Sequence, residues 1–245
     1  MVKKIHYIWL GNNPKSKLIK KCIKSWKKYF PNWEIIEWNE SNLDINANKY
    51  VKAAYEEKKY AFASDFFRFD VLKKEGGIYL DVDVEVIRPF EDLLKEHKCV
   101  MGFEFNKKTI NPGLILYVDE PGNSVISELG EKYSERSFFC QTSGIPKTIC
   151  EYTTEYFVQR GLREDDSFQV VDAVSIFPST YFCPTNREWS VQNFSAETRC
   201  VHHYGSSWLN QKAGLKFTFK KVYCKIFGNK GIAFAKKLLR EKNDL

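Results

Sequence analysis

The apolar positions in the first third of the chain follow the strand period and the helix period in turn. Pro14 stands at the first helical position after Asn13, a residue suited to cap a helix. Gly76 and Gly77 end the last of the helical stretches. The predicted strands are 5–10 and 35–38, and the predicted helices are 14–30, 49–58 and 64–75. Strands separated by helices indicate an α/β protein with a parallel sheet.

The stretch GGIYLDVDVEV at 76–86 places two aspartates in an otherwise apolar run. From residue 78 the positions alternate strictly, which predicts a strand over 78–86 with Tyr79, Asp81 and Asp83 on one face. Ligands of parallel sheets bind beyond the carboxyl ends of the strands. Two carboxylates at such an end form a hard-oxygen site for Mg²⁺ or Mn²⁺, ions that share their coordination with substrate phosphates.

Other interpretations of Asp81 and Asp83 and of the nearby Arg68 stay open. A lone D-x-D also fits surface or capping aspartates. Carboxylates among apolar neighbours are costly to desolvate unless a cation compensates them. Arg68 is the nearest candidate, since it follows Asp65 by three residues on the same helical face, although the two also fit an ordinary ion pair within a helix.

Length and charge divide the chain into two predicted parts. A chain of 245 residues with 43% hydrophobic composition can bury a core of its own. We expect a catalytic unit at 1–211 and a basic segment at 212–245. That segment holds ten Lys or Arg and two acidic residues, a surplus larger than the net charge of +7 of the whole chain. Its interleaved apolar residues fit an anionic membrane surface, nucleic acid, or helix faces over a core, but no nucleic-acid motif is recognisable, and we expect no nucleic-acid partner.

The cysteines indicate a reducing compartment. Seven cysteines without a C-x-x-C spacing argue against a disulfide framework and against a structural zinc site. The sequence contains no pattern typical of a secretory signal and no stretch of about 20 apolar residues. We therefore expect a cytoplasmic protein, either free or peripheral on the inner face of the cell membrane.

Three motifs in order carry a family resemblance: I-H-Y-I-W-L-G at 5–11, A-S-D-x-x-R at 63–68 and G-G-I-Y-L-D-x-D at 76–83. The chain resembles the DXD-motif sugar-nucleotide glycosyltransferases of bacterial capsular polysaccharide synthesis. These are related to the yeast initiating mannosyltransferases and to the catalytic domains of clostridial glucosylating toxins. The resemblance spans about residues 3–210, and its further pieces are T-S-G-I-P at 142–146, F-P-S-T-Y-F-C-P at 177–184 and H-H-Y-G-S-S-W at 202–208.

The resemblance implies a GT-A type fold, a Rossmann-like mixed and mainly parallel sheet flanked by helices, here followed by a helical basic C-terminal segment. It also implies Mn²⁺ or Mg²⁺ and a nucleoside-diphosphate sugar, most often a UDP-sugar. The implied reaction is retaining transfer of a hexose to a glycan or lipid-linked glycan in capsule, lipopolysaccharide or other surface glycan synthesis.

Three other functions remain as alternatives. One is a toxin-like enzyme with a protein acceptor, and another is a transferase-like binding module without catalysis. The third is a phosphatase of the haloacid dehalogenase type. It fits poorly, because Glu85 stands at the fifth motif position and the motif follows two strands and three helices.

By the resemblance, Trp9 matches the tryptophan that stacks on the uracil, and Asp81 and Asp83 match the DXD pair. The residues expected to bind the donor are Ile8, Trp9, Asp65, Arg68, Asp81, Ser206 and Trp208. The residues expected to be catalytic are Asp65, Arg68, Asp81 and Asp83.

The metal and acceptor positions are also carried over from the resemblance. The expected metal ligands are Asp81, Asp83 and His203, with His202 as an alternative to His203. Asn111, in N-P-G, resembles an N-x-G element near the acceptor in related retaining enzymes.

Overall fold

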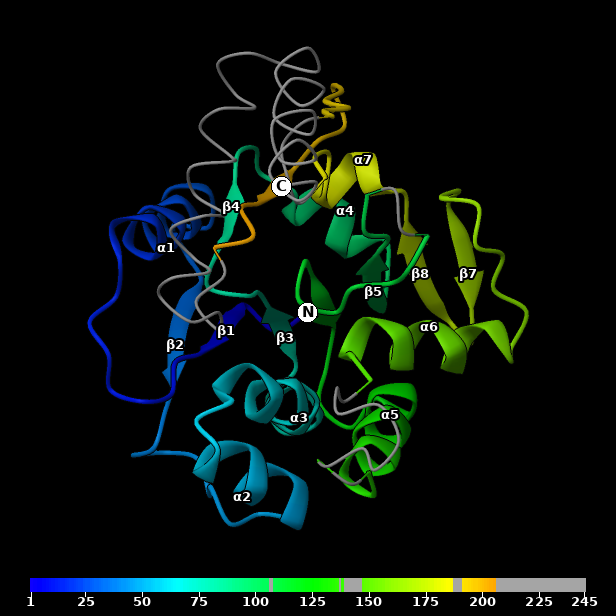
Figure 1. Cartoon of the computed structure of the whole chain (residues 1–245). Helices are drawn as coiled ribbons and strands as arrows, with labels where there is room; N and C mark the ends of the chain where they lie inside the picture. The colour runs from blue at the N-terminus through cyan, green and yellow to red at the C-terminus, as the bar shows by residue number, and fades with distance from the viewer. Residues whose placement is uncertain (106–107, 137, 139–146, 187–190, 206–245) are drawn as a thin grey trace, which may run out of the picture.

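The protein is described here from a computed structural model, which covers residues 1–105, 108–136, 138, 147–186 and 191–205 (Figure 1). The strands are β1 (Lys4–Ile8), β2 (Glu34–Trp38), β3 (Gly77–Tyr79), β4 (Val84–Val86), β5 (Cys99–Gly102), β6 (Leu116–Val118), β7 (Gln169–Val171), β8 (Val174–Phe177) and β9 (Cys200–His202). The helices are α1 (Lys17–Tyr29), α2 (Lys49–Glu56), α3 (Tyr60–Glu75), α4 (Glu91–Lys95), α5 (Ser124–Ser134), α6 (Ile149–Val158) and α7 (Ser179–Phe182). All five elements predicted up to residue 75 are present, with shifted ends.

The main sheet has seven strands in the order β2-β1-β3-β6-β5-β8-β7. β2, β1 and β3 run parallel, β6 is antiparallel to both of its neighbours, β5 and β8 are parallel, and β7 is antiparallel to β8. Five of the seven strands therefore share one direction. The expected fold, a mixed and mainly parallel sheet flanked by helices, is confirmed.

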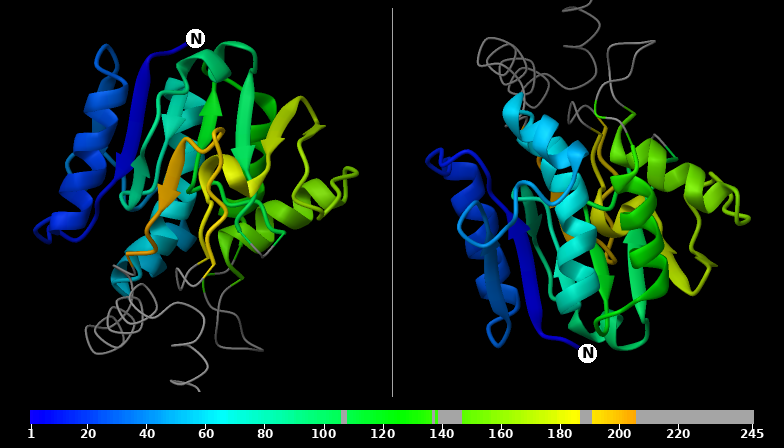
Figure 2. Two further views of the ribbon diagram at one scale, coloured as in Figure 1. Left: turned by 90° about the horizontal axis from the view of Figure 1, so that it is seen from above. Right: turned by 90° about the horizontal axis from the view of Figure 1, so that it is seen from below.

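Both faces of the sheet are covered, which explains its largely apolar strands. Figure 1 shows α2, α3, α5 and α6 on one face, and α1, α4, α7 and the small β4–β9 sheet on the other. Figure 2 shows α3 and α5 side by side, in agreement with their contacts. One apolar cluster lies under each layer, with Phe69 and Met101 in the first and Trp26 and Phe90 in the second.

α1 begins at a cap that the sequence analysis placed elsewhere. The side chain of Ser16, not that of Asn13, accepts a hydrogen bond from the Ile19 N–H. The buried face of α1 includes Trp26, whose indole Nε1 donates to the carbonyl of Val84 at 2.8 Å. This bond holds α1 against β4 and so against the segment that follows the two aspartates.

The continuous strand predicted over 78–86 is wrong. β3 ends at Tyr79, and the Val84 N–H donates to the Asp81 carbonyl at 3.0 Å across a turn. β4 then pairs with β9 in the separate two-stranded sheet. Tyr79, expected on the polar face, is only 2% exposed. The first half of this segment pairs with β6 and the second half pairs with β9. The alternation of a single strand therefore does not predict which side chains are buried along the whole segment.

The described residues include only some of those on which the predictions about cysteines and about membrane spans depend. Cys22, Cys99, Cys183 and Cys200 are free thiols and are buried, whereas Cys150 is partly exposed. None of the helices in the described part of the chain has the length and apolar character needed to cross a membrane. The segment 212–245, and with it the boundary predicted at residue 211, lies outside the described residues.

His6 is buried within the sheet in its neutral form. The Trp38 indole N–H donates to His6 Nδ1 at 3.0 Å, so His6 Nε2 carries the proton and donates to the Gly76 carbonyl at 2.9 Å. Burial lowers the pKa of His6 to about 4. The imidazole thus joins β1 to β2 and to the turn before β3.

Because the unfolded chain binds a proton at His6 below its ordinary pKa of about 6.5, acid should destabilise the fold through this residue. The free energy of unfolding keeps its full value with respect to His6 above about pH 6.5 and falls as the pH drops toward 4. The loss over that range is about 3 kcal/mol. We expect the His6 imidazole signal in NMR, assigned by its loss in His6→Asn, to titrate below pH 5. A midpoint near 6.5 would show that His6 is accessible to solvent.

Candidate active site

Asp81 lies directly beyond the carboxyl end of β3 and is held by three groups. Its N–H donates to the Gly113 carbonyl at 2.8 Å. Its Oδ1 accepts a hydrogen bond from the Tyr79 hydroxyl at 2.9 Å and lies 3.4 Å from Arg68 Nη2. A Cβ at Gly113 would overlap Asp81 Oδ2, so only glycine leaves room for this carboxylate. The orientation of Asp81 is therefore fixed from both sides.

Asp83 lies in the turn and faces the end of β9. Its Oδ2 accepts the Gly205 N–H at 2.6 Å, and its Oδ1 lies 3.2 Å from His202 Nε2. Burial by itself would raise the pKa of Asp83, but His202 and the Gly205 N–H together hold it at about 2. Burial opposes the charged form of His202, yet the Asp83 carboxylate raises the pKa of His202 well above its ordinary value. Asp83 is thus an anion at neutral pH.

The structure brings His202, rather than His203, to the aspartates. The register of β4 with β9 places Val84 opposite His202, so the His202 side chain reaches Asp83. His203 Nε2 lies 2.7 Å from Glu85 Oε2, away from Asp81. Consecutive residues of an extended chain point to opposite sides, which explains why one histidine is at the site and the other is not. The structure thus places His202, the alternative named in the sequence analysis, beside Asp83 and places His203 beside Glu85.

α3 presents a buried ion pair to the same site. Arg68 is 3% exposed, and its Nη2 donates to Asp65 Oδ1 at 2.6 Å. The Tyr133 hydroxyl on α5 donates to Asp65 Oδ2 at 3.3 Å. Burial raises the pKa of Asp65 to about 7, against the influence of Arg68. Arg68 Nε and Nη1 are buried without a hydrogen-bond partner among the described residues, so the three N–H groups on these two nitrogens are unsatisfied.

The part of the candidate site that is expected to bind the nucleotide lies beyond the end of β1. His6 pairs with Tyr79, so β1 and β3 end at the same edge of the sheet, and Trp9 lies on the edge that carries Asp81. Trp9 is partly exposed, and its Nε1 donates to the Asn13 carbonyl at 2.8 Å. Ile8 is buried in the apolar cluster that also contains residues of α2 and α3, and its contact with the nucleotide sugar stays a prediction.

Asn111 also lies beside the aspartates. Its Oδ1 accepts the N–H of Gly113, the residue whose carbonyl accepts from Asp81. The sequence analysis missed the supporting roles of Tyr79, Gly113 and Tyr133. The N-P-G spacing was a visible signal for Gly113, whereas nothing in the sequence relates Tyr133 to Asp65.

Several predicted site residues cannot be placed. Ser206, Trp208 and the T-S-G-I-P segment at 142–146 lie outside the described residues. Their assignment to the diphosphate and the glycosidic oxygen stays a prediction.

The residues present fit a divalent cation. One ligand atom each from Asp81, Asp83 and His202 lies within 4.8 Å of the other two. Carboxylate oxygens suit Mg²⁺ and Mn²⁺, and an imidazole adds a nitrogen ligand of a kind common at transition-metal sites. Gly113 and Gly205 leave space at the two carboxylates where side chains would intrude. Asp81, Asp83 and His202 would therefore hold the ion.

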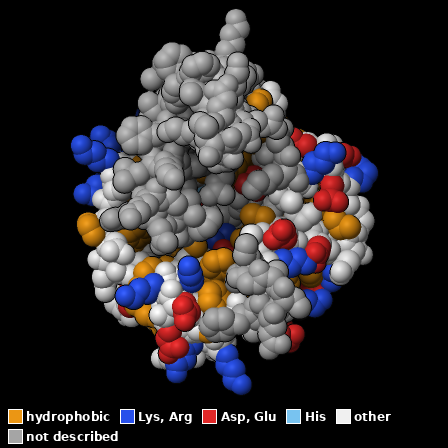
Figure 3. Space-filling view, in the orientation of Figure 1, with side chains coloured by type: hydrophobic (Ala, Val, Ile, Leu, Met, Phe, Trp, Pro, Cys, Tyr) orange, Lys and Arg blue, Asp and Glu red, His pale blue; other side chains and the backbone are white. Residues whose placement is uncertain are grey.

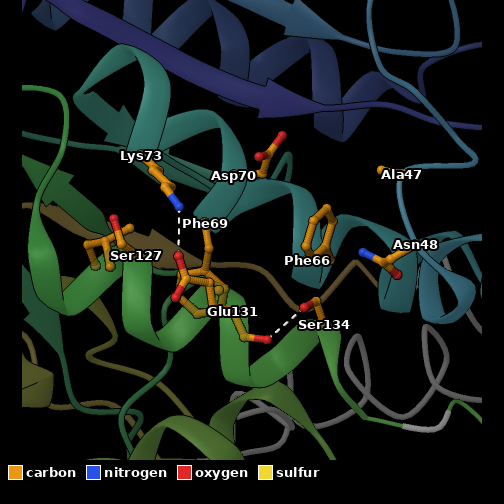
Figure 4. A pocket seen from close by; sticks show the side chains of 11 residues that line it. Ala47, Asn48, Phe66, Phe69, Asp70, Lys73, Ser127, Glu131 and Ser134 are labelled. Atoms are coloured by element: carbon orange, nitrogen blue, oxygen red, sulfur yellow. Dashed lines mark hydrogen bonds and ion pairs between the residues drawn. The ribbon is translucent and has the colours of Figure 1, made fainter.

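A surface pocket of about 190 Å³ lies between α3 and α5, far from this chemistry (Figure 4). Phe66 and Phe69 line it, and the Lys73–Glu131 ion pair crosses it at 2.8 Å. None of the aspartates or histidines described above contributes to it. It is not the candidate active site.

A mixed α/β sheet with the DXD pair beyond the carboxyl end of β3 agrees with the GT-A type fold that the sequence resemblance implied. Residues 16–100 match the family model "Glycosyltransferase sugar-binding region containing DXD motif". The match includes the motifs at 63–68 and 76–83, so the resemblance seen in the sequence is confirmed over this part of the chain.

Two curated relatives are similar over different lengths. "Subversion of eukaryotic traffic protein A" of Legionella pneumophila is 24% identical over 233 residues, which cover 82% of this chain and 34% of that protein. "Glucan organizing enzyme 1" of Cryptococcus neoformans var. grubii is 43% identical over 47 residues, or 19% of this chain and 13% of that protein. The chain thus spans about a third or less of the length of each.

Two solved structures resemble the chain at low identity. A galactosyltransferase, LgtC, in complex with donor and acceptor sugar analogues is 13% identical with a TM-score of 0.49, over 89% of this chain and 95% of that one. The PaToxG glycosyltransferase is 18% identical with a TM-score of 0.45, over 65% of this chain and 71% of that one.

Proposed function

We propose that this protein is a metal-dependent, retaining glycosyltransferase that moves a hexose from a UDP-sugar to a saccharide acceptor of a surface glycan. The observation that carries the proposal is the cluster of Asp81, Asp83 and His202 beyond β3, with its ligand atoms within 4.8 Å of one another. The family match over residues 16–100 supports the nucleotide-sugar donor. The UDP moiety, retention and the surface-glycan acceptor rest on the sequence resemblance.

In this proposal Asp81, Asp83 and His202 would hold a divalent cation, which would supply positive charge to stabilise the departing diphosphate. The chain's own residues set the geometry. Tyr79 and Arg68 orient Asp81, and the Gly205 N–H orients Asp83, so both carboxylates face the site before the donor arrives. The unsatisfied N–H groups on Arg68 Nε and Nη1 bind an oxygen of the nucleotide sugar. Trp9 offers an aromatic face for the uracil at the end of β1.

Asp65 lies one side chain farther from the cation site, behind Arg68. We propose that Asp65, while paired with Arg68, also binds a hydroxyl of the donor sugar. Its carboxylate would then lie near the anomeric carbon, where negative charge favours an oxocarbenium-like transition state. Asn111 is proposed to contact the acceptor from the adjoining turn, since its neighbour Gly113 bonds to the backbone of Asp81.

A thermal-shift screen with and without Mn²⁺ tests the donor. Only a ligand that binds the native state raises the melting temperature. The compounds are UDP-Glc, UDP-Gal, UDP-GlcNAc, UDP-GalNAc and GDP-Man. We expect a UDP-sugar to stabilise the protein and only with Mn²⁺ present, followed by slow hydrolysis of that donor. Failure of every compound to raise the melting temperature would favour the binding-module alternative.

A protein acceptor is the second candidate. The longer of the two curated alignments is with a protein named for subversion of eukaryotic traffic. Transfer of label from the preferred donor into a polysaccharide and lipid-linked fraction, compared with a protein fraction, separates the two. Label found only in protein would overturn the surface-glycan assignment.

The two adjacent histidines provide a matched pair of variants. His202→Ala should weaken Mn²⁺ binding by about tenfold or more, because it removes a proposed ligand. His203→Ala should change it by less than about threefold, since that side chain contacts Glu85. Titration of free Mn²⁺ by electron paramagnetic resonance measures both without reference to activity. The reverse order would return the metal-ligand role to His203.

A further inference from the structure

α1 carries a continuous stripe of lysines on its outer face. The lysine stripe consists of Lys17, Lys20, Lys21, Lys24, Lys27 and Lys28, all of which are exposed. Their spacings of three and four residues place them on one side of a 13-residue helix, opposite the buried Ile19, Cys22 and Trp26. At 1.5 Å per residue the stripe is about 16 Å long. Figure 3 shows Lys and Arg side chains gathered at the left edge, over α1.

The charge of the stripe is largely uncompensated by the described residues. Lys21 pairs with Glu85 Oε2 at 2.7 Å, and none of the other five lysines forms an ion pair with another described residue. α1 itself contains no acidic residue. Lys17 and Lys21, and Lys20 and Lys24, are separated by four residues, a spacing at which like charges destabilise a helix. The stripe costs stability within the fold, which indicates an anionic partner outside it.

The shape and composition of the stripe favour one kind of partner. The six cations are all lysines, whose ammonium groups act as hydrated point charges. They lack the planar guanidinium with which arginine forms bidentate hydrogen bonds to nucleic acids. The aromatic side chain beside the stripe, Tyr29, is covered by Lys28, whose Nζ lies 4.7 Å from the centroid of its ring, so this ring offers a base no open face on that side. Its apolar opposite face is buried in the core, so the helix cannot insert into hydrocarbon. What remains is adsorption onto a flat array of phosphates.

We propose that the lysine stripe of α1 docks the protein on an anionic phospholipid surface by electrostatic attraction alone. The stripe adjoins the candidate active site: a Cβ at Gly205, whose N–H binds Asp83, would lie 3.3 Å from the side chain of Leu18 at the start of α1. Docking therefore holds the edge of the site near the membrane plane. The proposal concerns α1 and not residues 212–245, and it does not depend on the transfer reaction.

Co-sedimentation of the full chain with vesicles tests the proposal. The vesicles are phosphatidylcholine alone, or phosphatidylcholine with phosphatidylglycerol, at low and at high salt. Binding should require the anionic lipid and be released by salt. The variant K17Q/K20Q/K24Q/K27Q should partition about tenfold more weakly or worse, because each lysine near the surface contributes to binding. Its melting temperature should be unchanged or higher, since repulsion within α1 is reduced.

A matched control changes the same charge elsewhere. Lys49, Lys52, Lys95 and Lys98 are exposed and form no ion pair with other described residues. Their replacement by glutamine should leave partitioning within about threefold, and arginine at the four stripe positions should retain binding. Equal losses in the stripe variant and the control, or no loss in either, would overturn the proposal. The proposal would also be overturned if the stripe variant kept vesicle binding but lost binding to an oligonucleotide, measured in parallel.

Discussion

Replacement of Asp83 by asparagine is expected to abolish Mn²⁺-dependent donor hydrolysis while the protein stays folded. Asp83 is ionised, with a pKa of about 2, and lies 3.2 Å from His202 Nε2. Asparagine keeps the shape and can still accept the Gly205 N–H, but it removes the negative charge that a hard cation requires. Loss of an outer-sphere partner alone costs 10- to 100-fold, so loss of this ligand should cost at least about a hundredfold.

The measurement is UDP release at saturating Mn²⁺, together with the melting temperature of the metal-free protein. Asp92→Asn serves as the control, since Asp92 is an exposed carboxylate on α4. It should have no effect on either quantity. Full hydrolysis by Asp83→Asn would remove Asp83 from the metal site.

Replacement of Arg68 by methionine is expected to have the largest effect on stability. The guanidinium is buried against Asp65 at 2.6 Å and against Asp81 at 3.4 Å, and it lies 4.9 Å from the centroid of the Tyr79 ring. Methionine fills much of the space but leaves two carboxylates without their cation. Breaking a buried ion pair in this way costs about 3–5 kcal/mol. Urea unfolding measures the loss.

A second substitution separates the structural role of Arg68 from its proposed role in donor binding. In the double variant R68M/D65L the uncompensated carboxylate of Asp65 is also absent, so much of the lost stability should return. Hydrolysis of the nucleotide sugar should stay at the level of Arg68→Met, because the unsatisfied N–H groups of Arg68 Nε and Nη1 are still missing. Recovery of both stability and hydrolysis would show that Arg68 acts only as a structural residue.

The sequence by itself determined the order of the elements up to residue 75 and the identity of the acidic pair. Strand and helix periods depend on neighbouring residues along the chain, and they correctly predicted β1, β2, α1, α2 and most of α3. The three N-terminal motifs indicated the family that the match over residues 16–100 confirms. The lysine stripe is equally a property of local spacing, since residues three or four apart share a helix face in any context.

Only the tertiary structure decided which side chains meet. Alternation over 78–86 predicted one strand, but pairing of β4 with β9 draws the second half of the segment into another sheet and creates the turn that carries Asp83. The same pairing selects His202 over His203, a difference of one residue that the sequence leaves open. Packing of α5 against α3 brings Tyr133 to Asp65 across 68 positions of the chain. Strand register and helix packing are set by contacts between distant segments, so local periodicity carries no information about them.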